Sequence, residues 1–310
     1  MSEFDWIARY FAPLAKSEGA SGLIDDVATL SGGASIVTTD AIVEGIHFLP
    51  SDPIETIARK LVRVNVSDLI AKGARPDEAL LTLGWPSGRH EDELARFANA
   101  FGDELAHWGA TLIGGDTVTA PNGLFLTLTL TGIPASARAP IRRSGAQVGD
   151  LIWVTGEIGA GYKGLRDALS GSDSGAVQKY RVPDVPPLEI ADLIANHATA
   201  SMDVSDGLIG DLQKLIIASG RGAHLDLDRV ETYCADEFPG IEEKLADVLA
   251  CCTGGDDYQC LFTAPEALSH EILEAPWKMS NIGRINSALN LTLSWHGRPV
   301  PLPKRAGFTH

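Results

Sequence analysis

The chain alternates between short apolar runs and longer segments in which apolar residues recur at helical spacing. Short runs bounded by glycine or polar residues predict strands, whereas apolar positions three or four apart predict amphipathic helices. In the first half we expect strands at 35–40, 78–85, 110–116 and 124–133, and helices at 55–66 and 92–109. In the second half we expect strands at 151–156, 223–228, 259–264 and 289–295, and helices near Leu165, at 188–198 and at 240–249.

A stretch rich in alanine, proline, arginine and glycine follows Pro134 and separates the two halves. Such a stretch is typical of a junction between domains. We therefore expect an N-terminal domain at 1–137 and a C-terminal domain at 138–310. Because strands with hairpin-like neighbours are mixed with helices, we expect two α+β domains with mixed or antiparallel sheets, rather than a doubly wound parallel sheet.

Composition narrows the function classes. The chain has 310 residues, 45% of them hydrophobic, and a formal net charge of −16 with no basic block, which argues against nucleic acid or an anionic membrane as a partner. It has no apolar run of membrane-spanning length, and its first residues lack the pattern of a secretory signal. The four cysteines, Cys234, Cys251, Cys252 and Cys260, form no C-x-x-C pair, so we expect reduced thiols in a cytoplasmic protein.

The common nucleotide-binding and hydrolase motifs are absent or weak. Residues 159–164 match G-x-G-x-x-G, but a polar, proline-rich loop follows where a dinucleotide-binding unit needs a second strand ending in an acid. We interpret them as a glycine-rich turn between a strand and a helix. The P-loop motif, the protein-kinase signature and G-x-S-x-G do not occur.

Acidic residues instead gather in six short clusters. These are IDD (24–26), TTD (38–40), NVSD (65–68), GGDT (114–117), DVSDG (203–207) and GGDDY (254–258). Each alone has an ordinary explanation; Asp68 and Asp206 could cap helices, and Asp116 could serve a turn. Together they supply the oxygen ligands that Mg²⁺ prefers, and paired glycines allow backbone to approach a phosphate closely. Bound Mg²⁺ would also let so acidic a protein bind a polyphosphate.

In chain order, WIARYF, TTD, HFLP, NVSDLIAKGA, LIGGDT, RSGAQVGD, DVSDGL and GGDDY resemble motifs of the thiamine-monophosphate kinase family, within the aminoimidazole ribonucleotide synthetase-like superfamily. The resemblance extends over nearly the whole chain. It implies two α+β domains, a homodimer formed through the N-terminal domains, and transfer of the γ-phosphoryl group of ATP to thiamine monophosphate. The product would be thiamine diphosphate.

The resemblance also implies roles for individual residues. The implied Mg²⁺ ligands are Asp26, Thr38, Thr39, Asp40, Asp68, Asp116, Asp203 and Asp206. The implied ATP contacts are Gly115, Asp116, Arg143 and Ser205, and the implied substrate contacts are His47, Asp256 and Phe308. Because the acceptor is a phosphate oxygen that is already ionised, no catalytic side chain is required, and we expect direct in-line transfer.

Two positions depart from the family pattern. Ile24 stands where the family usually has glycine, and because a β-branched residue resists positive φ, we expect a different backbone in this loop. Asp256 is one methylene shorter than the glutamate that is common there. The alternatives are another ATP-dependent enzyme of the same superfamily, or a non-catalytic sensor of nucleotide or divalent ions.

Overall fold

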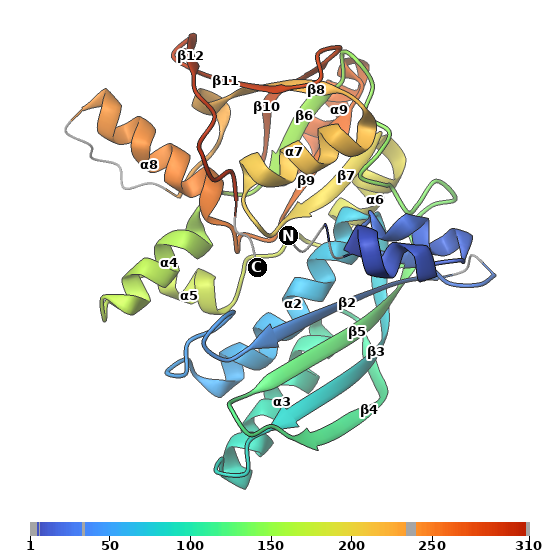
Figure 1. Ribbon diagram of the computed structural model, residues 1–310, viewed down its shortest axis with the longest axis vertical. Helices are drawn as coiled ribbons and strands as arrows, with labels where there is room; N and C mark the ends of the chain where they lie inside the picture. Colours follow the sequence, from blue (N-terminus) through green and yellow to red (C-terminus); the bar gives the residue numbers. More distant parts are fainter. Residues whose placement is uncertain (1–4, 6, 33–34, 234–239, 308–310) are drawn as a thin grey trace.

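The protein forms two β-sheets with helices packed between and around them (Figure 1). This computed structural model describes residues 5, 7–32, 35–233 and 240–307. Two residues singled out in the sequence, Cys234 and Phe308, lie outside the described residues. None of the helices in the described ranges is long and apolar enough to cross a membrane.

The N-terminal half forms a five-stranded sheet in the order β1-β2-β5-β3-β4. Its strands are β1 (Ala28–Thr29), β2 (Ile36–Val43), β3 (Ala74–Trp85), β4 (Thr111–Thr119) and β5 (Phe125–Pro134). All neighbouring pairs are antiparallel except β3 and β4, which α3 (Glu91–His107) connects as a parallel pair. Leucine and threonine alternate along β5, which buries Leu126, Leu128 and Leu130. This alternation is typical of a strand with one face toward a core.

The second half forms a seven-stranded sheet in the order β12-β11-β8-β10-β6-β9-β7, in which only β8 and β11 are parallel. Its strands are β6 (Leu151–Thr155), β7 (Ala200–Val204), β8 (Gly222–Asp226), β9 (Gln259–Ala264), β10 (Met279–Asn286), β11 (Leu291–Trp295) and β12 (Arg298–Val300). Its helices are α4 (Ala160–Leu169), α5 (Gly175–Arg181), α6 (Glu189–His197), α7 (Leu208–Ser219), α8 (Ile241–Gly254) and α9 (Ser269–Glu274). Short helical turns are η1 (Ile7–Phe11), η2 (Ala12–Leu14), η3 (Glu18–Leu23), η4 (Leu227–Arg229) and η5 (Glu266–Leu268).

Helix α2 (Ile54–Ala71) lies between the two sheets (Figure 1). It contacts β2, β3 and β5 on the N-terminal side and β7 and β9 on the C-terminal side. Because elements of both sheets pack against the helix, fourteen of its 18 residues are buried, including Lys60, Asn65, Ser67 and Asp68. A polar side chain buried in this way must have partners nearby. The central helix therefore carries polar groups to the boundary between the sheets.

The expected α+β class with mixed sheets is confirmed. The proposed junction at 137/138 lies between the end of β5 and the start of β6, and the boundary itself stays a prediction. The sequence did not predict β10, a central strand of the larger sheet. Its sequence, MSNIGRIN, is mostly polar and buries only Ile282 and Ile285, so it lacks the apolar run from which we predicted strands.

The turn between β6 and α4 confirms the interpretation of the G-x-G-x-x-G match. Gly159 adopts φ +94° directly before α4. The Asp257 carboxylate accepts hydrogen bonds from the backbone N–H groups of Gly159, at 2.9 Å, and of Gly161, at 3.3 Å. The start of α4, where a dinucleotide-binding fold would hold a phosphate, therefore already binds a carboxylate of the protein.

Candidate functional site

A cleft of about 520 Å³ opens where the two halves meet. It gathers residues from seven segments that lie far apart in the chain. Of the predicted site residues, Asp26, Thr38, Thr39, Asp40, His47, Asp68, Arg143, Asp203, Ser205, Asp206 and Asp256 line it. Folding thus brings most of the predicted set to one place, although their individual roles stay predictions.

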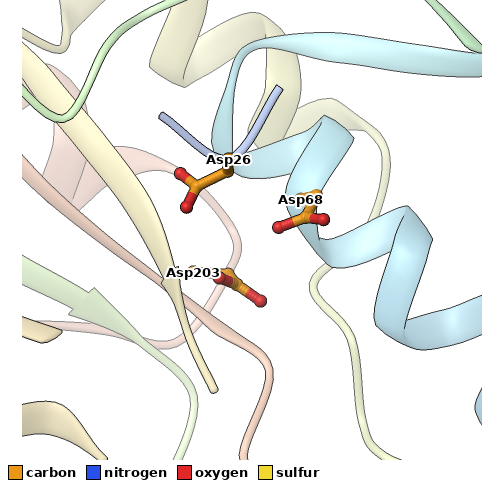
Figure 2. Close-up of side chains that lie close together, drawn as sticks. All are labelled: Asp26, Asp68 and Asp203. Carbon is orange, nitrogen blue, oxygen red and sulfur yellow. The ribbon is translucent and has the colours of Figure 1, made fainter. Parts of the chain in front are cut away.

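Three carboxylates form the centre of this cleft. Oxygen atoms of Asp26, Asp68 and Asp203 lie within 4.8 Å of one another, and Figure 2 shows the three side chains around one space. Thr38 Oγ1 donates to Asp68 Oδ2 at 2.5 Å, and Ser67 Oγ donates to Asp203 Oδ2 at 2.6 Å. The two Val-Ser-Asp stretches therefore meet, because Ser67 of the first binds Asp203 beside the second.

Burial and mutual repulsion disfavour the charged forms of these acids. The pKa of Asp203 is raised to about 8, first by burial and then by Asp26. The pKa of Asp68 is raised well above its ordinary value by burial, Asp203 and Asp40, and that of Asp40 is raised to about 6 by burial and by Asp26. Carboxylate oxygens that repel one another beside a threonine hydroxyl fit the oxygen-ligand preference of Mg²⁺.

Asp26 differs from its two neighbours because it already has cationic partners. Lys72 Nζ lies 2.5 Å from Asp26 Oδ2, and Arg143 Nε donates to Asp26 Oδ1 at 2.7 Å. Burial raises the pKa of Asp26, but Lys72 and Arg143 outweigh it and the net shift is downward. Asp26 is therefore an ionised carboxylate paired with cations, and it lies beside Asp68 and Asp203, whose negative charge is less compensated.

A buried lysine joins the two predicted substrate contacts. Lys60 Nζ donates to Asp256 Oδ2 at 2.6 Å and to the His47 carbonyl at 3.0 Å, and it lies 4.3 Å from the centre of the Tyr180 ring. The Lys60 side chain is only 1% exposed. Asp256 itself adopts φ +67°, and its N–H donates to the Ser205 carbonyl at 2.7 Å. The sequence did not predict a role for Lys60, which links His47 of the N-terminal half to Asp256 of the C-terminal half.

The interpretation of Asp68 and Asp206 as helix caps is wrong. Asp68 lies in the last turn of α2, and Asp206 precedes Gly207, where α7 begins without a side-chain cap from that residue. The acid that accepts the N–H groups of Asp206 and Gly207 is Asp211, from the first turn of α7. Lys214 forms ion pairs with both Asp206 and Asp211, so this part of the cleft wall also has a resident cation.

Asp116 and Gly115 are not brought into the cleft. Both lie on β4, the edge strand of the smaller sheet, in which every residue is exposed. Asp116 is paired in register with Thr82, Thr82 with Thr127, and Thr127 with Ala41 of β2. Since neighbouring strands are about 4.8 Å apart, Asp116 lies roughly 14 Å across the sheet from β2.

The loop before Asp26 accommodates Ile24 without positive φ at that residue. Ile24 has φ −113°, whereas Ser21, Gly22 and Leu23 have φ values of 49°, 68° and 58°. A β-branched side chain is strained at positive φ, so the left-handed turn falls on the three residues that precede it.

In the absence of divalent ions, we expect the free energy of unfolding to fall as the pH rises from about 5 to about 8. The pKa values of Asp40, Asp257 and Asp203 are raised from 3.8 to about 6, 7 and 8. Between the unfolded and folded pKa values the folded chain binds more protons, so raising the pH favours unfolding. Asp26, whose pKa is lowered, contributes only at more acidic pH.

Mg²⁺ should counteract this loss by binding the ionised carboxylates of the folded chain. Melting curves should therefore show a larger rise in melting temperature on adding MgCl₂ at pH 8 than at pH 5.5, by at least about 3 °C. NaCl at equal ionic strength serves as the control. Equal shifts at both pH values would contradict the prediction.

Comparisons with known proteins extend over both sheets. Residues 24–134 match the N-terminal domain of the AIR synthase related proteins, and residues 147–295 match their C-terminal domain. The thiamine-monophosphate kinase of Caulobacter vibrioides is 35% identical over 325 residues, covering 100% of this chain and 91% of the relative. That of Salmonella typhimurium is 35% identical over 325 residues, covering 99% and 98%. The solved structure of AaThiL complexed with AMPPCP and TMP matches with a TM-score of 0.84 and 26% identity, covering 100% of this chain and 97% of that one.

Proposed function

The chain belongs to the thiamine-monophosphate kinase family of AIR synthase related proteins, and we propose that it transfers the γ-phosphoryl group of ATP to thiamine monophosphate, forming thiamine diphosphate and ADP. The observation that carries the proposal is the convergence of Asp26, Asp68 and Asp203 in the cleft between the two halves. A similar structure described as complexed with AMPPCP and TMP supports a nucleotide and a thiamine phosphate as the two ligands.

We assign the cleft residues to three tasks. Asp26, Thr38, Thr39, Asp40, Asp68, Asp203 and Asp206 would hold Mg²⁺, which when bound neutralises phosphate oxygens and aligns them for transfer. Arg143 and Ser205 would contact the ATP phosphates, with Arg143 offering a planar fork of donors. His47 and Asp256, fixed by Lys60, would hold thiamine monophosphate, together with Phe308. No side chain need act as a base, since the acceptor oxygen is already ionised.

We also propose a homodimer in which the exposed edge of the smaller sheet pairs with a second copy. All nine residues of β4 are exposed, and Leu112, Ile113 and Val118 on it are each about half exposed. An apolar, unpaired edge strand is a surface that proteins normally cover. In such a dimer, Gly115 and Asp116 of one copy would reach the ATP bound in the cleft of the other.

A cytoplasmic location is proposed because both substrates of the reaction, ATP and thiamine monophosphate, are charged metabolites that the cell retains. The proposal requires no nucleic acid or membrane partner, in keeping with the net charge of −16.

³¹P NMR of the protein with ATP, thiamine monophosphate and MgCl₂ tests the function. We expect the monophosphate resonance to disappear while the resonances of ADP and of a second diphosphate grow together. Omitting MgCl₂, or omitting thiamine monophosphate, should prevent the change. Unchanged spectra together with measurable nucleotide binding would favour the sensor, and ADP formed only with a different acceptor would favour another enzyme of the superfamily.

Replacing Lys60 with methionine should lower the catalytic efficiency with thiamine monophosphate, the phosphoryl acceptor. The change keeps a long, unbranched side chain but leaves Asp256 without its buried cationic partner. We therefore expect kcat/KM for thiamine monophosphate to fall by about 10–100-fold. The KM for ATP should stay within about twofold, because Lys60 contacts none of the proposed ATP ligands.

Lys163→Met is a matched control, since Lys163 forms an ion pair with Asp247 and does not line the cleft. Steady-state kinetics with each substrate varied in turn provides the measurement. Equal changes for both substrates would indicate a general structural role for Lys60 instead.

A further inference from the structure

A second buried lysine, Lys72, reaches into the acidic cluster from the end of α2. Its side chain is 0% exposed, and its Nζ lies 2.7 Å from Asp25 Oδ1 and 2.5 Å from Asp26 Oδ2. It also donates to the Ser201 carbonyl at 2.5 Å. Three oxygens from two separate segments of the chain thus surround one ammonium group.

The backbone fixes this lysine firmly in place. The Lys72 N–H donates to the Asp68 carbonyl at 3.1 Å, and the Lys72 carbonyl accepts from Ile141 N–H at 3.1 Å. The position directly after a helix also favours a positive charge, since the helix dipole is negative at that end. Lys72 is therefore a permanent part of the site, whereas Arg143, with 20% of its side chain exposed, lies on the cleft wall.

The charge around the cluster is unevenly compensated. Asp25 and Asp26 pair with Lys72, and Asp26 also pairs with Arg143. Asp68 and Asp203 receive hydroxyl hydrogen bonds from Thr38 and Ser67, and in the described residues no ion pair is formed by either. One side of the cluster therefore already holds a cation among carboxylate oxygens, and the other side does not.

We propose that Lys72 is a built-in cation of this cleft, which takes the place of one divalent ion between Asp25 and Asp26. Asp26 then shares only an ion held with Asp68 and Asp203, so that the site binds fewer Mg²⁺ ions than its carboxylates alone would hold. The inference rests on the proposed function, because it assumes that the cluster binds Mg²⁺. A divalent ion within a few ångströms of a fixed ammonium group is repelled by it, so Lys72 directs metal toward Asp68 and Asp203.

A purely structural lysine would behave differently. If Lys72 served only to fasten the 24–26 segment to α2, its removal would lower stability without changing the number of ions bound. If it stands in for a metal ion, its removal leaves two adjacent carboxylates, Asp25 and Asp26, available to another divalent cation.

Counting bound Mn²⁺ by electron paramagnetic resonance and calorimetry distinguishes these roles. We expect Lys72→Met to bind one more Mn²⁺ per chain than the wild-type protein, or to bind its first Mn²⁺ at least about tenfold more tightly. Lys163→Met removes the same charge from an ion pair outside the cleft and should leave both quantities unchanged. Asp25→Asn, which leaves Lys72 less compensated, should weaken Mn²⁺ binding.

Thermal melting with and without Mn²⁺ covers the case in which Lys72→Met folds poorly. A variant that melts low without metal and recovers on adding Mn²⁺ supports the proposal, because the ion then replaces the lost ammonium. A variant with unchanged Mn²⁺ number and affinity, or one that Mn²⁺ does not rescue, overturns it. If the wild-type protein binds no Mn²⁺, the proposed metal site itself is wrong. If the wild-type protein binds Mn²⁺ and Lys72→Met binds it identically, only the proposed role of Lys72 is wrong.

Discussion

Replacing Asp68 with asparagine is expected to lower kcat by about 10²–10³-fold or more while raising the melting temperature of the metal-free protein. Asparagine keeps the shape of the side chain, and its carbonyl oxygen can still accept the hydrogen bond that Thr38 Oγ1 gives to Asp68. The variant lacks a carboxyl group whose ionisation is disfavoured first by burial and then by Asp203 and Asp40, which raise its pKa. Removing that ionisable group should stabilise the metal-free fold and remove a proposed metal ligand at the same time.

A fall in kcat together with a rise in melting temperature distinguishes loss of a metal ligand from general damage to the fold, which would lower both. Asp150→Asn is the matched control, because Asp150 is also buried but accepts hydrogen bonds from Gln147 and Thr199 outside the cleft. It should lower the melting temperature and leave kcat of the folded enzyme near that of the wild type. Coupled assays of ADP release and scanning calorimetry provide the measurements. Near wild-type turnover in a folded Asp68→Asn protein would remove Asp68 from the metal site.

The sequence predicted the centre of the site because its acids occur in short motifs at the edges of regular elements. Asp26, Asp68 and Asp203 come from clusters nearly 180 residues apart, yet they meet as expected. Sequence reasoning could also predict the fold class, since strand-length and helical patterns alternate clearly. A helix-capping role for Asp68 was wrong, because the helix expected at 55–66 continues to Ala71 and Asp68 lies in its last turn.

The buried lysines of the site were not predicted, because a lysine in a helix is usually solvated. Lys60 and Lys72 are among the largest fully buried side chains of the protein. The available signal was the sequence of α2, whose apolar residues extend beyond a single face and therefore indicate burial on several sides. Polar residues within such a helix need charged or hydrogen-bonding partners, so the same signal that marks Asp68 also applies to Lys60 and Asn65. Contacts between the two halves depend on tertiary packing that no local pattern encodes.

Asp116 lies outside the cleft of its own chain. The structure places Asp116 on the exposed edge strand β4, roughly 14 Å across the sheet from β2, although the motifs imply that it binds both metal and ATP. If the partner subunit supplies it, Asp116→Asn alone should lower kcat by about 10²-fold or more, as Asp68→Asn does. Mixing the two inactive variants under conditions that exchange subunits should then restore activity.

The expected recovery follows from the symmetry of a homodimer. In a mixed dimer, one cleft combines an intact Asp68 with an intact Asp116 of the partner subunit, whereas the other cleft carries both substitutions. Because half of the dimers are mixed after random exchange, activity should return to roughly one quarter of the wild-type value. Unmixed variants and a mixture of Asp68→Asn with Asp203→Asn, whose residues share one cleft within a chain, are the controls and should stay inactive. If both residues acted within the same chain, no mixture would recover activity, and Asp116 would have to reach ATP from its own subunit.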